Sequence, residues 1–155
     1  MKQVSLDEIS SWMSPARSKR SLSNALGAEH LAMHHYVLDP GESFGFGYHR
    51  HADQEEIFYV LEGTVTFETE SGDVTVGAGE AIRFASGEWQ QGHNETDEQV
   101  VALALGAPAD TTELDVRREC GNCGERQPVR IGPTDDREAL VAICEECGAE
   151  TVRHS

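Results

Sequence analysis

The chain is poor in lysine. Among its 155 residues only Lys2 and Lys19 are lysines, beside ten arginines, and 28 acidic residues give a formal net charge of −16. A surface rich in carboxylates keeps a protein hydrated in molar salt, where charge repulsion is screened within about 3 Å. We therefore expect an acidic surface from a halophile, with an ordinary acidic protein at low salt as the second interpretation. The same charge balance argues against a broad nucleic-acid-binding face.

Long apolar runs are missing as well. No stretch of 18 apolar residues occurs, and the N-terminal string MKQVSLDEISSWM is too polar for the core of a signal peptide. We expect a soluble, cytoplasmic protein with no membrane partner. Hydrophobic residues make up 38% of the chain and aromatic residues 6%, which allows a core of only modest size.

Cysteine is absent from the first 119 residues and then occurs in two Cys-x2-Cys pairs, each followed by glycine. This spacing favours a metal site over a disulfide scaffold, and a redox dithiol is the weaker alternative. Each glycine permits a tight turn that directs backbone amides at the thiolates, so we expect a closed tetrahedral zinc site. Its ligands are Cys120, Cys123, Cys144 and Cys147.

The segment around these cysteines resembles a zinc ribbon, with short strands expected at 126–131 and 139–143. We assign residues 116–155 to this unit. A ribbon of this size buries too little apolar surface to fold alone, so the zinc supplies its stability.

A second candidate metal site consists of His49, His51 and Glu56. Side chains alternate along a strand, so the two imidazoles point to the same face. Glu56 begins an apolar run that is typical of a buried strand, whereas Glu55 is expected to face outward. Two imidazoles and a carboxylate suit iron, manganese, nickel or zinc. A His-x-His pair alone is weak evidence, because such pairs are often only polar surface.

The string HRHADQEEIFYVLEG, residues 49–63, resembles the first motif of the cupin family. Glu56 falls in the acidic position of that motif and Gly63 in its glycine position. The resemblance implies a jelly-roll barrel, also called a double-stranded β-helix, with a metal at its centre and frequent dimerisation.

The string GEAIRFASGEWQQGHN, residues 79–94, resembles the second cupin motif, with Gly79, Gly87 and Asn94 in register. Gln90 stands where the family has its third metal-binding histidine. Its side chain offers only a neutral carbonyl oxygen, a weaker ligand than imidazole. His93 falls on the opposite face of a regular strand, so only a bulge would let it replace the missing histidine.

Two interpretations of this site remain open. His49, His51 and Glu56, with Gln90 or water, resemble the two-histidine, one-carboxylate arrangement that leaves open positions on iron. Alternatively, the barrel holds no metal tightly, and these groups serve as acid, base or hydrogen-bonding partners of a small molecule.

The chain as a whole is predicted to be all-β. Short alternating segments broken by glycine turns predict a barrel over residues 30–106, and the segment 64–68 places Val65 and Phe67 on its buried face. Residues 1–29 are expected to pack on the barrel, and residues 107–115 to form a polar linker to the ribbon.

Two clusters near the N-terminus receive structural interpretations. The basic cluster of Arg17, Lys19 and Arg20 is expected to be a solvated loop. The adjacent His34 and His35 face opposite ways on a strand and are interpreted as structural.

Fold alone does not select an activity. Our leading hypothesis is a metal-binding cupin that binds or transforms a small molecule, assembles as a homodimer and carries a structural zinc. The alternative is a non-catalytic sensor or interaction module whose ribbon contacts a protein partner. Core packing competes with a pocket role for the candidate pocket aromatics, which are Phe44, Tyr48, Phe58 and Trp89.

Overall fold

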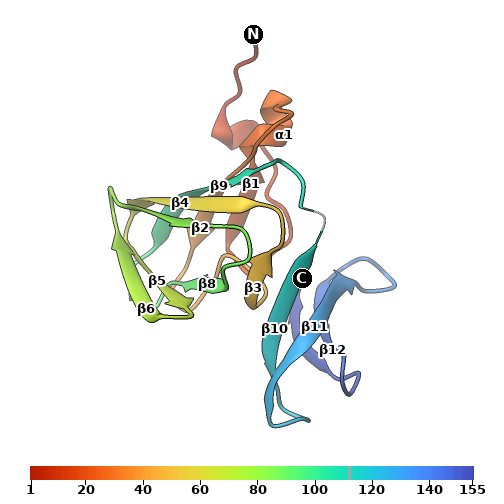
Figure 1. Ribbon diagram of the computed structural model, residues 1–155. Helices are drawn as coiled ribbons and strands as arrows, with labels where there is room; N and C mark the ends of the chain where they lie inside the picture. Colours follow the sequence, from red (N-terminus) through yellow and green to blue (C-terminus); the bar gives the residue numbers. More distant parts are fainter. Residues whose placement is uncertain (112) are drawn as a thin grey trace.

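The computed structural model describes residues 1–111 and 113–155 (Figure 1). It is built almost entirely of strands, which confirms the all-β prediction. The helical segments are the 3₁₀ helix η1 (Leu6–Glu8) and the short helix α1 (Leu22–Leu26). The strands are β1 (Ser18–Ser21), β2 (Ala32–Leu38), β3 (Tyr48–His51), β4 (Glu55–Glu62), β5 (Thr64–Thr69), β6 (Gly72–Gly77), β7 (Ala81–Phe84), β8 (Gln90–His93), β9 (Val100–Ala107), β10 (Leu114–Cys120), β11 (Glu125–Pro133), β12 (Leu140–Cys144) and β13 (Glu150–His154).

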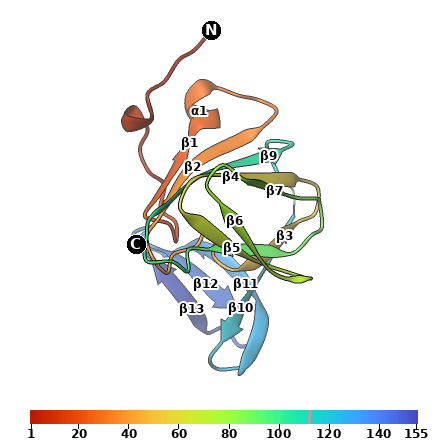
Figure 2. The ribbon, with the colours of Figure 1, turned by 90° about the vertical axis from the view of Figure 1, so that its left-hand side faces the viewer.

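These strands form two sheets. One has the order β1-β2-β9-β4-β7, and the other has the order β13-β12-β11-β10-β3-β8-β5-β6. Their barrel parts face one another around a common core, while β10 to β13 extend below the barrel (Figure 2). The barrel and the C-terminal strands therefore share one continuous hydrogen-bonded sheet.

The barrel core follows from alternation along its strands. Val65 and Phe67 are fully buried, as the pattern of β5 predicted. Gly92 of β8 faces the same interior, where an added Cβ would lie 2.7 Å from both Phe44 and Phe67. The aromatic cluster of this core consists of Tyr36, Phe44, Phe58, Phe67 and Phe84.

The C-terminal unit is joined to the barrel through β10. This strand begins at Leu114, inside the segment expected to be a linker, and pairs antiparallel with β3. In that register Val116 lies opposite His49 and Leu114 opposite His51. The strand that carries both histidines is thus held on one edge by the ribbon.

The N-terminal segment also joins a sheet. β1 pairs with β2 and places Lys19 opposite Tyr36. The expectation of a solvated loop for the basic cluster is therefore wrong for Lys19 and Arg20, which lie in β1. The error arose because two polar strand residues carry no hydrophobic signal, although long-range pairing with β2 makes them part of the sheet.

In the part of the chain that the structure describes, no helix is long and apolar enough to cross a membrane.

Candidate metal centre

Two histidines on β3 point into the barrel. β3 lies between β8 and β10, and His49 is directly opposite Gln90 of β8. Alternation sends residues 49 and 51 inward and residues 48 and 50 outward. Glu56 reaches the same interior from β4, so three strands of both sheets meet at this point.

The three predicted ligands are brought together. The Oε2 atom of Glu56 lies 3.3 Å from Nε2 of His51 and 4.0 Å from Nε2 of His49. One donor atom from each residue lies within 4.8 Å of the others. Glu55 instead points outward and forms an ion pair of 2.7 Å with Arg83, as expected for its position.

The tautomer of His49 directs the lone pair of Nε2 toward the other candidate metal ligands. Its Nδ1–H donates a hydrogen bond of 2.8 Å to the carbonyl oxygen of Gly47, which can only accept. Nε2 is therefore unprotonated, and burial, the main cause, lowers the pKa of His49. A backbone carbonyl behind a metal-ligating histidine is a common second-shell partner. No residue with a Cβ fits at Gly47, because that atom would lie 2.5 Å from the carbonyl oxygen of Arg117.

Gln90 lies at the centre of the site with only 1% of its surface exposed. Its amide nitrogen donates hydrogen bonds of 3.0 Å to Nε2 of His49 and 3.0 Å to Oε2 of Glu56. Its buried Oε1 atom has no partner among the described residues. A half-turn of the amide would bring Oε1 to the nitrogen and oxygen atoms of His49 and Glu56, and it would break both hydrogen bonds of the amide nitrogen.

The residues present thus fit a divalent metal ion. His49, His51 and Glu56 supply imidazole nitrogens and a carboxylate, the donor set that iron, manganese, nickel and zinc share. The unpartnered Oε1 of Gln90 offers a neutral oxygen as a fourth donor. His93 does not join them: it lies on the other side of β8, where it lines a shallow surface hollow with Pro40 and Thr96.

A cavity opens above these donors. It consists of two adjoining hollows of 340 and 350 Å³, and both are lined by Lys19, Tyr36, His51 and Glu56. Phe44 and Phe58 contribute to the first hollow, as predicted for them, although both are also buried in the core.

The walls of this cavity come from three parts of the chain. Trp12 and Met13 of the N-terminal segment line it on one side, and Ile131 and Leu140 of the ribbon line it on another. Sequence reasoning missed Lys19 here, and its only sequence signal was the scarcity of lysine in the chain.

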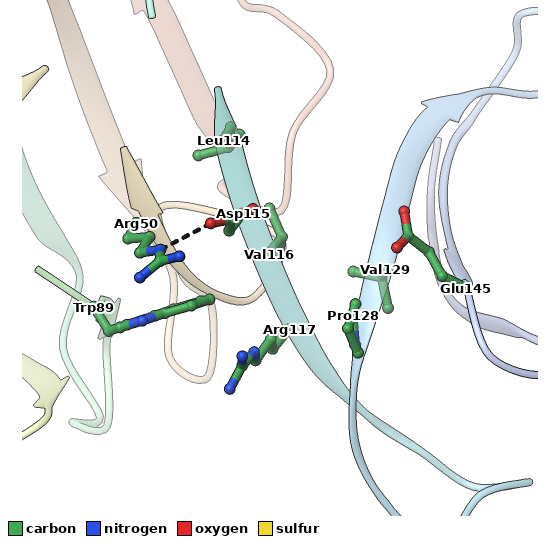
Figure 3. Close-up of a pocket in the computed structure, with 9 residues that line it drawn as sticks. All are labelled: Arg50, Trp89, Leu114, Asp115, Val116, Arg117, Pro128, Val129 and Glu145. Carbon is green, nitrogen blue, oxygen red and sulfur yellow. Dashed lines mark hydrogen bonds and ion pairs between the residues drawn. The ribbon is translucent and has the colours of Figure 1, made fainter. Parts of the chain in front are cut away.

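Tyr48 and Trp89 are not part of this cavity, which corrects the prediction that they line the pocket. They stack on the opposite face of β3, with ring centroids 5.3 Å apart. Arg50 and Arg117 cover Trp89 at 5.0 and 4.6 Å, beside a separate hollow of 210 Å³ between β3, β10 and β11 (Figure 3). The physical reason is alternation: residue 48 adjoins His49 and so faces the other way.

The four cysteines form a second cluster at the far end of the ribbon. Sγ of Cys120 lies 3.5 Å from that of Cys147, and Sγ of Cys123 lies 3.9 Å from that of Cys144. All four are free thiols with donor atoms within 4.8 Å of one another. The backbone amide of Cys123 is the main cause that lowers the pKa of Cys120 to about 7. The side chain of Cys147 is the main cause that raises the pKa of the neighbouring Cys123, so the thiolate character that favours metal binding belongs to Cys120.

The glycines after the cysteine pairs adopt the expected conformation. Gly124 and Gly148 both have φ of 75°, and their amides donate to the carbonyl oxygens of Cys120 and Cys144 at 2.8 and 2.9 Å. A cluster of four sulfurs fits a metal ion such as zinc.

Solved structures share this architecture. The sugar phosphate isomerase of the cupin superfamily from Silicibacter pomeroyi aligns over 97% of this chain and 92% of its own, with a TM-score of 0.63 and 21% identity. The polyketide cyclase RemF from Streptomyces resistomycificus aligns over 78% and 88%, with a TM-score of 0.65 and 22% identity. A predicted oxalate decarboxylase from Thermotoga maritima aligns over 69% and 99%, with a TM-score of 0.58 and 25% identity. At these identities the first two likenesses establish the fold only.

No curated protein matches the chain significantly. Residues 34–106, which carry His49, His51, Glu56 and Gln90, match the family model described as Cupin domain. The barrel thus has the cupin fold, and residues 34–106 of it match the model of a cupin domain.

Proposed function

We propose that the barrel binds one divalent transition-metal ion on His49, His51 and Glu56, beside Gln90, and transforms a small molecule in the cavity above it. The observation that carries the proposal is the convergence of three donor atoms, within 4.8 Å of one another, at the base of a cavity. When bound, such an ion supplies Lewis-acid polarisation of substrate oxygens or a site for dioxygen.

The protein's own groups set the conditions for this chemistry. The carbonyl of Gly47 holds His49 in the tautomer that presents Nε2 to the site. The aromatic wall of Phe44 and Phe58 excludes water from one side, which strengthens electrostatic interactions within the cavity. With only three strong donors, the site keeps open positions for a substrate.

The structural neighbours do not select the reaction. They are described as a sugar phosphate isomerase, a polyketide cyclase and a predicted oxalate decarboxylase, and these proteins catalyse three different chemistries. We propose a small oxygen-rich molecule as the ligand, because a hard oxygen donor suits an ion held by imidazole and carboxylate. The cysteine cluster is proposed to bind a structural zinc ion.

Metal content tests this proposal. Protein purified in molar salt is expected to contain two metal ions per chain by elemental analysis. Replacing both His49 and His51 by alanine should remove one ion and leave zinc, and replacing Cys120 and Cys144 by serine should remove the zinc. A wild-type chain that contains a single zinc ion, which the cysteine variant loses, would overturn the proposal of a metal ion in the barrel.

A sensor is the second candidate, and one observation favours it. Ile131 and Leu140 of the ribbon line the same cavity as the proposed metal ligands, so an occupant contacts both parts. Arg126 also ties the ribbon to Glu68 of β5 by ion-pair contacts of 2.7 and 3.2 Å. Turnover of a ligand found by a thermal-shift screen of metabolites separates the enzyme from a sensor, which binds without product. Sedimentation of the same protein measures whether it forms the proposed homodimer.

A further inference from the structure

Lys19 places a cation inside the cavity between two aromatic rings. Its ammonium lies 5.6 Å from the ring centroid of Trp12 and 5.6 Å from that of Tyr36. Both hollows of the cavity include it. Among residues 1–111 and 113–155, no ion pair or side-chain hydrogen bond involves this ammonium. The side chain of Lys19 is half-buried. A partly desolvated ammonium needs hydrogen-bond acceptors, whereas the two aromatic faces offer it only cation–π attraction.

The chain holds Lys19 in this position on both sides. β1 pairs with β2, which places Lys19 opposite Tyr36. The carbonyl oxygen of Lys19 accepts a hydrogen bond of 2.7 Å from the amide of Trp12, and its amide donates 3.0 Å to Oγ of Ser11. The N-terminal segment is thus fixed over β1, with the Trp12 ring beside the ammonium.

Glu56 is the nearest source of negative charge, but it is already engaged. Its Oε2 atom accepts from Gln90 at 3.0 Å and lies 3.3 Å from Nε2 of His51. The attraction between Glu56 and Lys19 is weaker than the desolvation that lowers the pKa of Lys19. The ammonium of Lys19 therefore keeps hydrogen-bonding capacity that Glu56 does not satisfy and that the oxygens of an anionic ligand would fill.

Building on the proposed metal site, we propose that Lys19 binds the anionic oxygens of the ligand, so that the barrel takes a small molecule bearing a carboxylate or phosphate group. The other end of that molecule lies against the donors His49, His51 and Glu56. Tyr36 stays protonated beside it, because burial, the main cause, raises its pKa. The ammonium, with three N–H donors, matches an oxyanion as a compact point charge.

This assignment explains an unusual use of lysine. The chain carries lysine at only two positions, and Lys2 is exposed near the N-terminus. The other lysine, Lys19, lies inside the cavity. Lys19 lies outside residues 34–106, so it is not among the residues that match the cupin model.

Calorimetry on the full zinc-loaded chain tests the assignment with two probes, inorganic phosphate and malonate. We expect at least one probe to bind wild type and Lys19→Met to weaken that binding by about tenfold or more, the usual effect of losing a charged hydrogen bond. Preference for one probe tells a phosphate ligand from a carboxylate. Lys2→Met, the matched control, and Lys19→Arg should retain binding. Wild-type affinity in Lys19→Met, or no binding of either probe to wild type, would overturn the assignment.

A second measurement does not depend on the folding of Lys19→Met. In the Lys2→Met chain, Lys19 is the single lysine, so a carbon-13 label on its ε-carbon gives one resonance. Saturable movement of that resonance on adding the probe that binds supports the assignment, and a resonance that stays fixed contradicts it. If the resonance moves in a chain whose barrel binds no metal, the anion site stands and the proposed metal function fails. If the barrel binds metal and the resonance does not move, the proposed metal function stands and the anion site fails.

Discussion

Replacing Gln90 by histidine tests the physical account of the barrel site most directly. The Gln90 amide donates to Nε2 of His49 and to Oε2 of Glu56, each at 3.0 Å. A metal ion that uses these same lone pairs must break both hydrogen bonds. Gln90→His removes the amide and adds an imidazole at a position with 1% exposure.

The size of the effect follows from those two bonds. One has a neutral acceptor and the other a carboxylate, which together contribute about 2–4 kcal/mol. At about 1.4 kcal/mol per factor of ten, this corresponds to a roughly thirtyfold to several-hundredfold loss of metal affinity in the wild type. Gln90→His should therefore bind the barrel metal at least about thirtyfold more tightly, before the added imidazole is counted.

Competition between the protein and a chromophoric chelator measures this difference, with the cysteine-bound metal as an internal reference. Gln99→His is the matched control, because Gln99 is exposed and bonds to Asp39 away from the site. It should leave the barrel affinity unchanged. A folded Gln90→His chain that retains its ribbon zinc and binds the barrel metal no more tightly than wild type would refute the competition argument.

Three further predictions follow from the fold. Cys144→Ser should abolish zinc binding by the ribbon and also weaken metal binding in the barrel by about tenfold or more. The reason is that β3 pairs with β10 at four positions and with β8 at only one. An unchanged barrel affinity in a metal titration would contradict this coupling. Phe67→Ala should lower the free energy of unfolding in urea by about 3–5 kcal/mol, whereas Thr66→Ala on the same strand should change it little, and similar losses would show that Phe67 is not in a packed core. Burial, the main cause, lowers the pKa of His34 to about 4, so the unfolded chain binds the extra proton first and stability should fall as pH drops from about 6.5 to about 4. His34→Gln should flatten that decline in thermal melts, and an unchanged slope would assign it to other groups.

Local geometry accounts for the three candidate ligands that the structure brings together. His49 and His51 share a face because alternation is a property of any strand, and Glu56 follows at the start of the next strand. Alternation also separates His93 from Gln90, which the structure bears out. The same rule places Tyr48 behind His49, so the sequence contained the signal against a pocket role for Tyr48.

Other features depended on pairing between distant segments. Residues 107–115 were predicted to be a linker, but strand β10 begins at Leu114 within them. This strand forms because it pairs with β3, more than sixty residues earlier in the chain. Polar composition alone could not reveal this pairing, since edge contacts in a sheet use backbone groups that every residue carries.

The sequence by itself determined which residues are available as ligands: two histidines at strand spacing, a carboxylate, a glutamine in place of a third imidazole, and four cysteines at ribbon spacing. These assignments need only the period of a strand and the chemistry of each side chain. The tertiary structure decided which way the Gln90 amide faces, that the ribbon supports β3, and that Lys19 enters the cavity. Those outcomes depend on hydrogen bonds and desolvation among segments far apart in the chain, and no local pattern records them.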